Sequence, residues 1–115
     1  MHYTMRSEDH RVKGERLRRT LAKLQSGDDY EVVIETCYAA AVQFLAVLSQ
    51  GRLGRHHDTH KGLARFLDDA GLPEAATRFR DLEALRASRF YGAQGNGQAA
   101  KFAREVLDAI LAAIH

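Results

Sequence analysis

The chain has 115 residues, of which 45% are hydrophobic and 28% are charged. A chain of this length forms one domain with a buried core, and this composition excludes a largely disordered protein. The formal net charge is only +2, which is too small for composition alone to indicate nucleic-acid binding.

The first predicted helix covers about residues 7–26 and stops at Gly27. Its narrow apolar stripe consists of Leu17, Leu21 and Leu24. The basic side chains of this region are Arg6, Arg11, Lys13, Arg16, Arg18, Arg19 and Lys23, against the acids Glu8, Asp9 and Glu15. Such a face could follow the phosphates of a nucleic acid, but a solvated helix surface explains the same charges and is the commoner case. Both interpretations stay open.

The second predicted helix is long and supplies most of the core. Its apolar residues recur at steps of three and four: Tyr30, Val33, Ile34, Cys37, Tyr38, Ala41, Phe44, Leu45 and Leu48. Asp28 or Asp29 is the predicted N-cap, and Gly51 and Gly54 end the helix.

This helix contains the only cysteine, Cys37, so no disulfide can form within the chain. Its apolar neighbours predict a small core residue. The most apolar stretch, residues 39–48, is shorter than a membrane-spanning helix and contains Gln43. Residues 1–8 carry no hydrophobic signal region. We therefore expect a cytoplasmic protein without a membrane span.

Two further helices follow. Asp58 can cap a short helix that Gly71 ends. Its shared face is His60, Leu63, Phe66, Leu67 and Ala70. Pro73 suits the first turn of a fourth helix that reaches about Tyr91, because its missing N–H is not needed there.

The last predicted helix runs from Gln98 to about Ala113, after a glycine-rich connector at 92–97. Its buried side is predicted to be Phe102, Val106, Ile110 and Ile114. No alternating strand pattern occurs in the sequence, so we predict an all-α fold, an antiparallel up-and-down bundle of four to five helices. The bundle forms a single domain over 1–115, with its core at about 28–114.

Two arginines of the fourth predicted helix need a partner. At about 100° per residue, Arg86 and Arg89 fall in the sector of the apolar residues Ala75, Phe79 and Leu82. An isolated buried guanidinium costs several kcal/mol. The partner is a carboxylate of this chain in a structural ion pair, a second subunit, or the phosphate of a ligand. The candidate carboxylates are Glu31, Glu35, Asp68 and Asp69.

Other motifs carry less chemistry. His56, His57 and His60 form the densest cluster of possible metal ligands, but a third ligand and the HExxH glutamate are missing, so no metal and no cofactor is predicted. His60 is read as a core histidine. The connector at 92–97 precedes a helix but lacks the strand, lysine and hydroxyl of a phosphate-binding loop, which favours a simple turn.

Four patterns in order nevertheless resemble a known family. They are Tyr-Ala-Ala at 38–40, His-Lys-Gly-Leu at 60–63, Leu85–Arg86 followed by Tyr91–Gly92, and an alanine-rich last helix. In this order and spacing, residues 28–110 resemble the HEPN domains of prokaryotes, in particular the small stand-alone ones.

The resemblance implies a helical bundle that often dimerises and is commonly encoded beside a minimal nucleotidyltransferase. Active members cleave RNA without metal at a dimer cleft, using an arginine that a histidine follows after four to six residues. Arg86 matches this arginine, but Tyr91 stands where the histidine would fall, and no histidine lies between Arg86 and His115. Tyrosine titrates too high to replace histidine at neutral pH.

We therefore expect a homodimer whose groove binds a nucleotide or RNA phosphate without turnover, as part of a nucleotidyltransferase or toxin–antitoxin type system. The residues expected to bind phosphate are Arg86, Arg89, Tyr91, His60 and Lys61. One alternative is a protein-interaction subunit, antitoxin-like or presenting a substrate to a nucleotidyltransferase. Another is a degenerate metal-independent ribonuclease, whose catalytic candidates would be Arg86, Tyr91 and His60.

Overall fold

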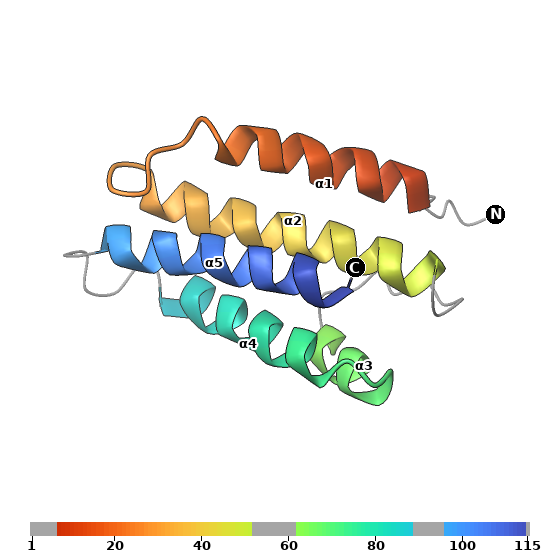
Figure 1. The fold of residues 1–115 in the computed structure, drawn as a ribbon. Coiled ribbons are helices and arrows are strands. Elements are labelled where there is room, and N and C mark those ends of the chain that lie inside the picture. Colours follow the sequence, from red (N-terminus) through yellow and green to blue (C-terminus); the bar gives the residue numbers. More distant parts are fainter. Residues whose placement is uncertain (1–6, 52–61, 89–95, 115) are drawn as a thin grey trace.

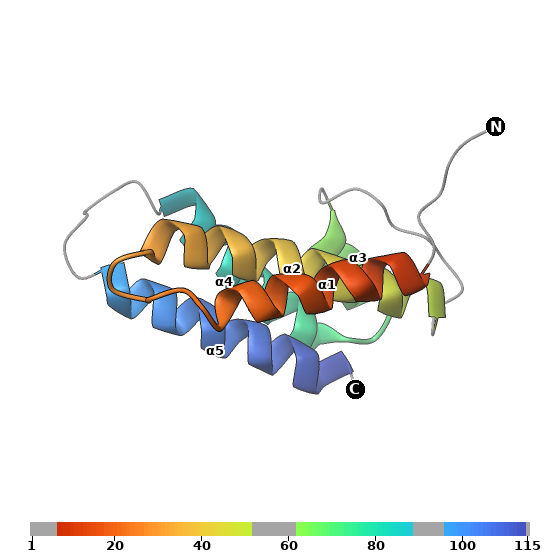
Figure 2. The ribbon, with the colours of Figure 1, turned by 90° about the horizontal axis from the view of Figure 1, so that it is seen from above.

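The computed structural model describes residues 7–51, 62–88 and 96–114, and these ranges contain five helices and no strand. The helices are α1 (Ser7–Leu21), α2 (Tyr30–Gly51), α3 (Leu63–Asp69), α4 (Pro73–Ser88) and α5 (Asn96–Ile114). Each long helix runs antiparallel to the long helix before it, whereas α2 and α5 run parallel, with α1 and α4 on either side (Figures 1 and 2). The all-α bundle is confirmed.

Helix α1 is one turn shorter than predicted, because the chain tightens after Leu21. The amide of Ala22 still donates to the carbonyl of Arg18 at 3.2 Å. Leu24 instead donates to Leu21, three residues back, at 3.1 Å, and the chain turns toward α2. Leu24 nevertheless packs against the core, so the apolar stripe continues beyond the end of the helix.

Helix α2 is the centre of the bundle and packs against α1, α4 and α5. It begins as predicted: the carbonyl of Asp29 accepts the amide of Val33 at 2.9 Å, and its carboxylate accepts the amide of Gln25 at 2.8 Å. The 19 residues Tyr30–Leu48 have a mean hydropathy of 1.6, long and apolar enough to cross a membrane. The prediction that no stretch meets this criterion was wrong, although 56% of the segment is buried as in a core helix.

Gly14 of α1 is buried and lies against Phe44 of α2. A Cβ atom at this position would lie 2.9 Å from Cε2 of the Phe44 ring. Nearby, the buried His10 donates from Nδ1 to the side-chain oxygen of Gln43 at 2.7 Å. Glycine therefore permits an approach between the two helices that a larger residue would hinder.

Glycines bound α3 on both sides. Gly62 and Gly71 have φ angles of 79° and 80°, which favour glycine. After the helix, the amide of Leu72 donates to the carbonyl of Leu67 at 2.9 Å, the bond that closes a glycine-ended helix.

Helix α3 begins at Leu63 with Gly62 in the N-cap position, so the prediction that Asp58 caps this helix and that His60 lies on its face was wrong. Asp58 and His60 themselves lie outside the described residues.

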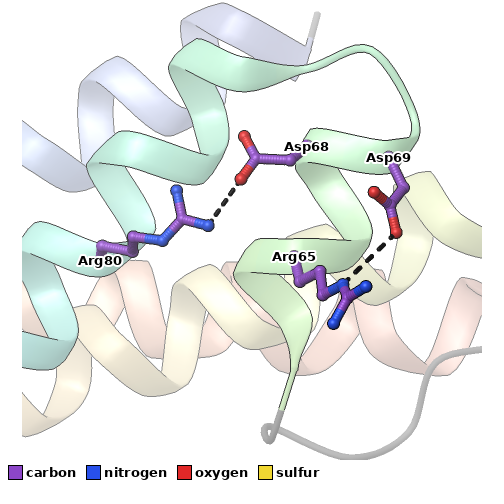
Figure 3. Close-up of polar contacts among 4 residues, drawn as sticks. All are labelled: Arg65, Asp68, Asp69 and Arg80. Atoms are coloured by element: carbon purple, nitrogen blue, oxygen red, sulfur yellow. Dashed lines mark hydrogen bonds and ion pairs between the residues drawn. The ribbon is translucent and has the colours of Figure 1, made fainter.

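One ion pair connects α3 to α4, and a second lies within α3. Arg80 of α4 pairs with Asp68 of α3, and Arg65 reaches Asp69 within α3 at 4.0 Å (Figure 3). All four side chains are at least one third exposed. Such pairs add little to stability, but they occupy two of the carboxylates that were candidates for Arg86.

One residue of α5 that was predicted to be buried is not: the side chain of Phe102 is 41% exposed. The side of α5 that is buried consists of Ala100, Ala103, Val106, Leu107, Ile110 and Leu111. Successive four-residue steps drift around a helix by about 40° each, so the series from Phe102 to Ile110 moves from the edge of the buried side into it. Val106 and Ile110 are buried as predicted.

Candidate functional site

Arg86 lies in the last turn of α4, four residues after Leu82. Leu82 and Phe79 are completely buried, and the helical period puts Arg86 on the same side of α4. Its side chain is nevertheless 44% exposed. The prediction that the Arg86 guanidinium is buried is therefore wrong. Arg86 does lie in the predicted sector of α4, but the core does not cover its side chain in this last turn.

The guanidinium of Arg86 is held by two residues of α2. Its Nε donates to both carboxylate oxygens of Glu35, each at 3.2 Å. Its Cζ lies 4.6 Å from the ring centroid of Tyr38. Because Glu35 and Tyr38 are three residues apart on one helix, they face Arg86 together. A charge-assisted pair and a cation–π contact thus both orient the guanidinium.

Of the candidate carboxylates, Glu35 therefore faces Arg86, while Asp68 and Asp69 face Arg80 and Arg65 (Figure 3). The side chain of Glu35 is 37% exposed. An ion pair this open to solvent contributes about 0–1 kcal/mol. Stability alone is thus a weak reason for an arginine at this position.

Tyr38 forms a rigid base under the guanidinium. Its ring is 4% exposed and stacks on Phe79, with the centroids 5.4 Å apart and the planes at 26°. Burial raises the pKa of the Tyr38 phenol above its ordinary value of 10.0. The carboxylate of Glu83 raises that pKa as well, and Arg86 opposes the shift. The phenol is therefore neutral at physiological pH.

The surface is hollowed beside these residues. The hollow has a volume of about 360 Å³, and Tyr38, Glu83, Arg86 and Ala87 line it. We call it the Arg86 hollow. Its volume lies near the lower end of the range for small-molecule sites. Among the described residues of this lining, the charged groups are one carboxylate and one guanidinium, both from α4.

The remaining predicted site residues cannot be placed in this arrangement. Arg89, Tyr91, His60 and Lys61 lie outside the described residues, as do most of the 92–97 connector and the histidines His56 and His57. Of the five predicted phosphate-binding residues, the structure thus places Arg86 alone and brings Glu35, Tyr38 and Glu83 near it.

Two features of the polar interior were missed by sequence reasoning. One is the buried contact between His10 and Gln43. The other is Arg104 of α5, which donates to the carbonyls of Leu21 and Leu24 at 3.0 and 2.9 Å and to the hydroxyl of Ser26 at 3.0 Å. A signal for Arg104 existed, because it shares a helical sector with the buried residues Ala100, Leu107 and Leu111.

Cys37 is the small core residue that the sequence predicts. It is completely buried, and burial raises the pKa of its thiol to about 12. A thiol with this pKa is protonated at neutral pH and is a poor nucleophile. Cys37 is therefore not part of a reactive site.

Comparison of the chain with models of protein families, with curated proteins and with solved structures finds no match.

Proposed function

We propose that this protein is a HEPN-like domain that binds a phosphate of a nucleotide or RNA through Arg86, without turnover. In this proposal it is a cytoplasmic homodimer and part of a nucleotidyltransferase or toxin–antitoxin type system. Arg89, Tyr91, His60 and Lys61 complete the phosphate-binding groove. The resemblance to HEPN domains over residues 28–110 motivates the proposal.

The observation that carries it is the arrangement of the Arg86 guanidinium. The group is fixed by Glu35 and Tyr38 but remains 44% exposed beside a hollow. A planar guanidinium that is already oriented loses little freedom when it binds, and the edge formed by its two terminal nitrogens matches two phosphate oxygens. In this proposal the phosphate meets the exposed part of the guanidinium, next to the pair with Glu35.

Binding without turnover follows from the acids and bases available. Residues 87–114 contain no histidine at the position of the HEPN general base or acid, and the proposal assigns His60 to phosphate binding and not to proton transfer. The raised pKa of Tyr38 makes its phenol a worse base at neutral pH than an ordinary tyrosine. Arg86 itself stays protonated, so it can stabilise negative charge but cannot accept a proton.

The test is titration of the whole protein with mononucleotides and short single-stranded RNAs. Arg86→Ala should weaken binding by about 10-fold or more, since a hydrogen bond to a charged group contributes about 1.5–3 kcal/mol. Arg65→Ala is the matched control, because Arg65 is also an exposed arginine paired with a carboxylate. Equal binding by wild type and Arg86→Ala would contradict the proposal.

The dimer is tested separately by light scattering coupled to size-exclusion chromatography. We expect twice the mass of the 12.9 kDa chain at micromolar concentration. A monomer that still binds nucleotide through Arg86 would remove the dimer groove from the proposal and leave the phosphate contact. RNA cleavage by the pure protein that Arg86→Ala abolishes would instead support the ribonuclease alternative.

A further inference from the structure

We infer that the Arg86 hollow holds a guanine base, so that the ligand of this protein carries guanine next to the phosphate that Arg86 binds. The inference rests on the proposed function, because it names the chemical class of the nucleotide at the same site. Three features of the hollow carry it: a stacking surface, a carboxylate on its wall and the balance of charge.

The stacking surface is the plane of the Arg86 guanidinium. The Cζ atom of the guanidinium lies over the Tyr38 ring, 4.6 Å from the centroid, and Tyr38 in turn stacks on the buried Phe79. The same guanidinium lines the hollow. Unpaired bases stack on arginine planes as they do on aromatic rings. A base in the hollow would thus extend a stack that already contains Phe79, Tyr38 and Arg86.

The carboxylate on the wall is Glu83, which precedes Arg86 by three residues and so lies on the neighbouring turn of α4. An ionised carboxylate only accepts hydrogen bonds. Guanine offers it two adjacent donors on the Watson–Crick edge, the ring N–H and the exocyclic amino group. Adenine and cytosine place an acceptor next to their single donor group, and uracil places acceptors on both sides. Guanine therefore fits Glu83 best.

The charge balance points the same way. Among the residues that the structure describes, the wall of the hollow carries one negative and one positive group, Glu83 and Arg86, and Glu35 adds a second carboxylate that pairs with the guanidinium. An inorganic phosphate inside the hollow would be repelled by Glu83. A neutral base is not repelled, and its phosphate can remain outside the hollow, beside the exposed Arg86 side chain. The small side chain of Ala87 takes up little of the space on the α4 wall.

The experiment compares the affinities of GMP, IMP, AMP and inorganic phosphate by calorimetric titration of the whole protein. IMP keeps the ring N–H of guanine but lacks the exocyclic amino group, so it tests one of the two hydrogen bonds. We expect GMP to bind about 10-fold more tightly than AMP, as is usual for a bidentate base contact, with IMP between them. Inorganic phosphate should bind more weakly than any of the three nucleotides.

The decisive variant is Glu83→Gln, which keeps the size of an exposed side chain and removes its charge. It should bring the affinity for GMP to within about 3-fold of that for AMP while leaving AMP almost unchanged. Glu74→Gln is the matched control, because Glu74 is an exposed acid of the same helix and is not among the described residues that line the hollow. It should keep the preference for GMP.

The outcomes separate the two proposals. Equal binding of GMP and AMP, with both lost in Arg86→Ala, would overturn the guanine inference and leave the phosphate contact standing. No binding of any nucleotide or short RNA would overturn both. A single-stranded RNA with one guanine that binds more tightly than GMP, while its adenine counterpart does not, would support the inference and identify RNA as the source of the base.

Discussion

Arg86 and Arg104 are both cations in the apolar sector of a helix, yet they meet different partners. Arg104 of α5 donates to two backbone carbonyls and one hydroxyl at the end of α1. Arg86 of α4 meets a carboxylate, an aromatic ring and a hollow. The partners of Arg104 are peptide groups that the fold must satisfy. Those of Arg86 are side chains that could exchange with a ligand.

This difference separates an architectural arginine from a candidate binding arginine. The last carbonyls of a helix have no partner within the helix, and a side chain from another helix can satisfy them. Arg104 does this across 83 residues of sequence and so connects α5 to the turn between α1 and α2. No helix end depends on the contacts of Arg86 that the structure shows. The two arginines should therefore respond differently to removal.

The largest effect is expected from Arg104→Ala. The variant leaves the carbonyls of Leu21 and Leu24 without a charged donor at a partly buried site. It should lower the free energy of unfolding by about 2–4 kcal/mol, less than three separate charged hydrogen bonds would contribute, because water reaches part of the site. The measurement is urea unfolding followed by far-ultraviolet circular dichroism.

Arg104→Lys is the control for charge. An ammonium keeps the positive charge but lacks the planar fork that meets three acceptors at once, so it should recover only part of the loss. If Arg104→Ala unfolds within about 0.5 kcal/mol of wild type, a value ordinary for surface substitutions, the architectural role of Arg104 is wrong.

A smaller loss is expected from Gly14→Ala, at the other point where α1 is held. The new Cβ would lie 2.9 Å from the Phe44 ring, and overpacking of this kind costs about 1–3 kcal/mol. Alanine recovers up to about 1 kcal/mol through its higher helix propensity. We expect a net loss of about 1 kcal/mol in the same unfolding experiment.

Gly27→Ala provides the comparison, because no atom outside the adjacent residues lies within 4 Å of the position of its Cβ. A gain in stability from Gly14→Ala would mean that the Phe44 ring yields easily. The connection of α1 to the bundle would then depend chiefly on Arg104.

Arg86→Ala should change stability less than either variant. The pair with Glu35 is exposed, so its loss should cost no more than about 1 kcal/mol, while nucleotide binding falls as proposed above. The measurement is the same urea unfolding, with Arg65→Ala as control. A loss as large as that of Arg104→Ala would make Arg86 a second architectural arginine and remove the reason to assign it a ligand.

The sequence predicted the fold well because its signals are local. The period of α2 and the glycine at 71 that ends α3 are signals of single elements, and both appear in the structure. The errors arose where an apolar residue continued a helical pattern. Leu24 continues the pattern of α1 but lies beyond the end of that helix, and Phe102 continues the pattern of α5 but lies outside its buried side. The length of a helix and its buried side depend on neighbours that no local pattern records.

The site was predicted less completely. The helical period placed Arg86 in the right sector, and Glu35 was among its candidate partners. Burial was misjudged, because it depends on how far the core extends over the last turn of α4. Glu83 carries no periodic signal, and the contacts of Arg104 join residues about 80 positions apart. Only the three-dimensional packing brings these groups together.

The smallest expected effect is a change in the pKa of Tyr38, which reports directly on the charges at the Arg86 hollow. Burial raises this pKa most, Glu83 raises it as well, and Arg86 lowers it. Arg86→Gln should therefore raise the pKa of Tyr38 further, whereas Glu83→Gln should lower it. The ultraviolet absorbance of the phenolate measures both, with Tyr38→Phe identifying the signal among four tyrosines.

Circular dichroism at each pH confirms that the protein is still folded during this titration. Opposite shifts in the two variants would show that the guanidinium and the carboxylate both act on the Tyr38 ring in solution, as the hollow requires. Shifts of the same sign would mean that the substitutions change the burial of Tyr38 instead. The stack of Phe79, Tyr38 and Arg86 would then not be the fixed surface that distinguishes this arginine from Arg104, and the assignment of a base to it would lose its support.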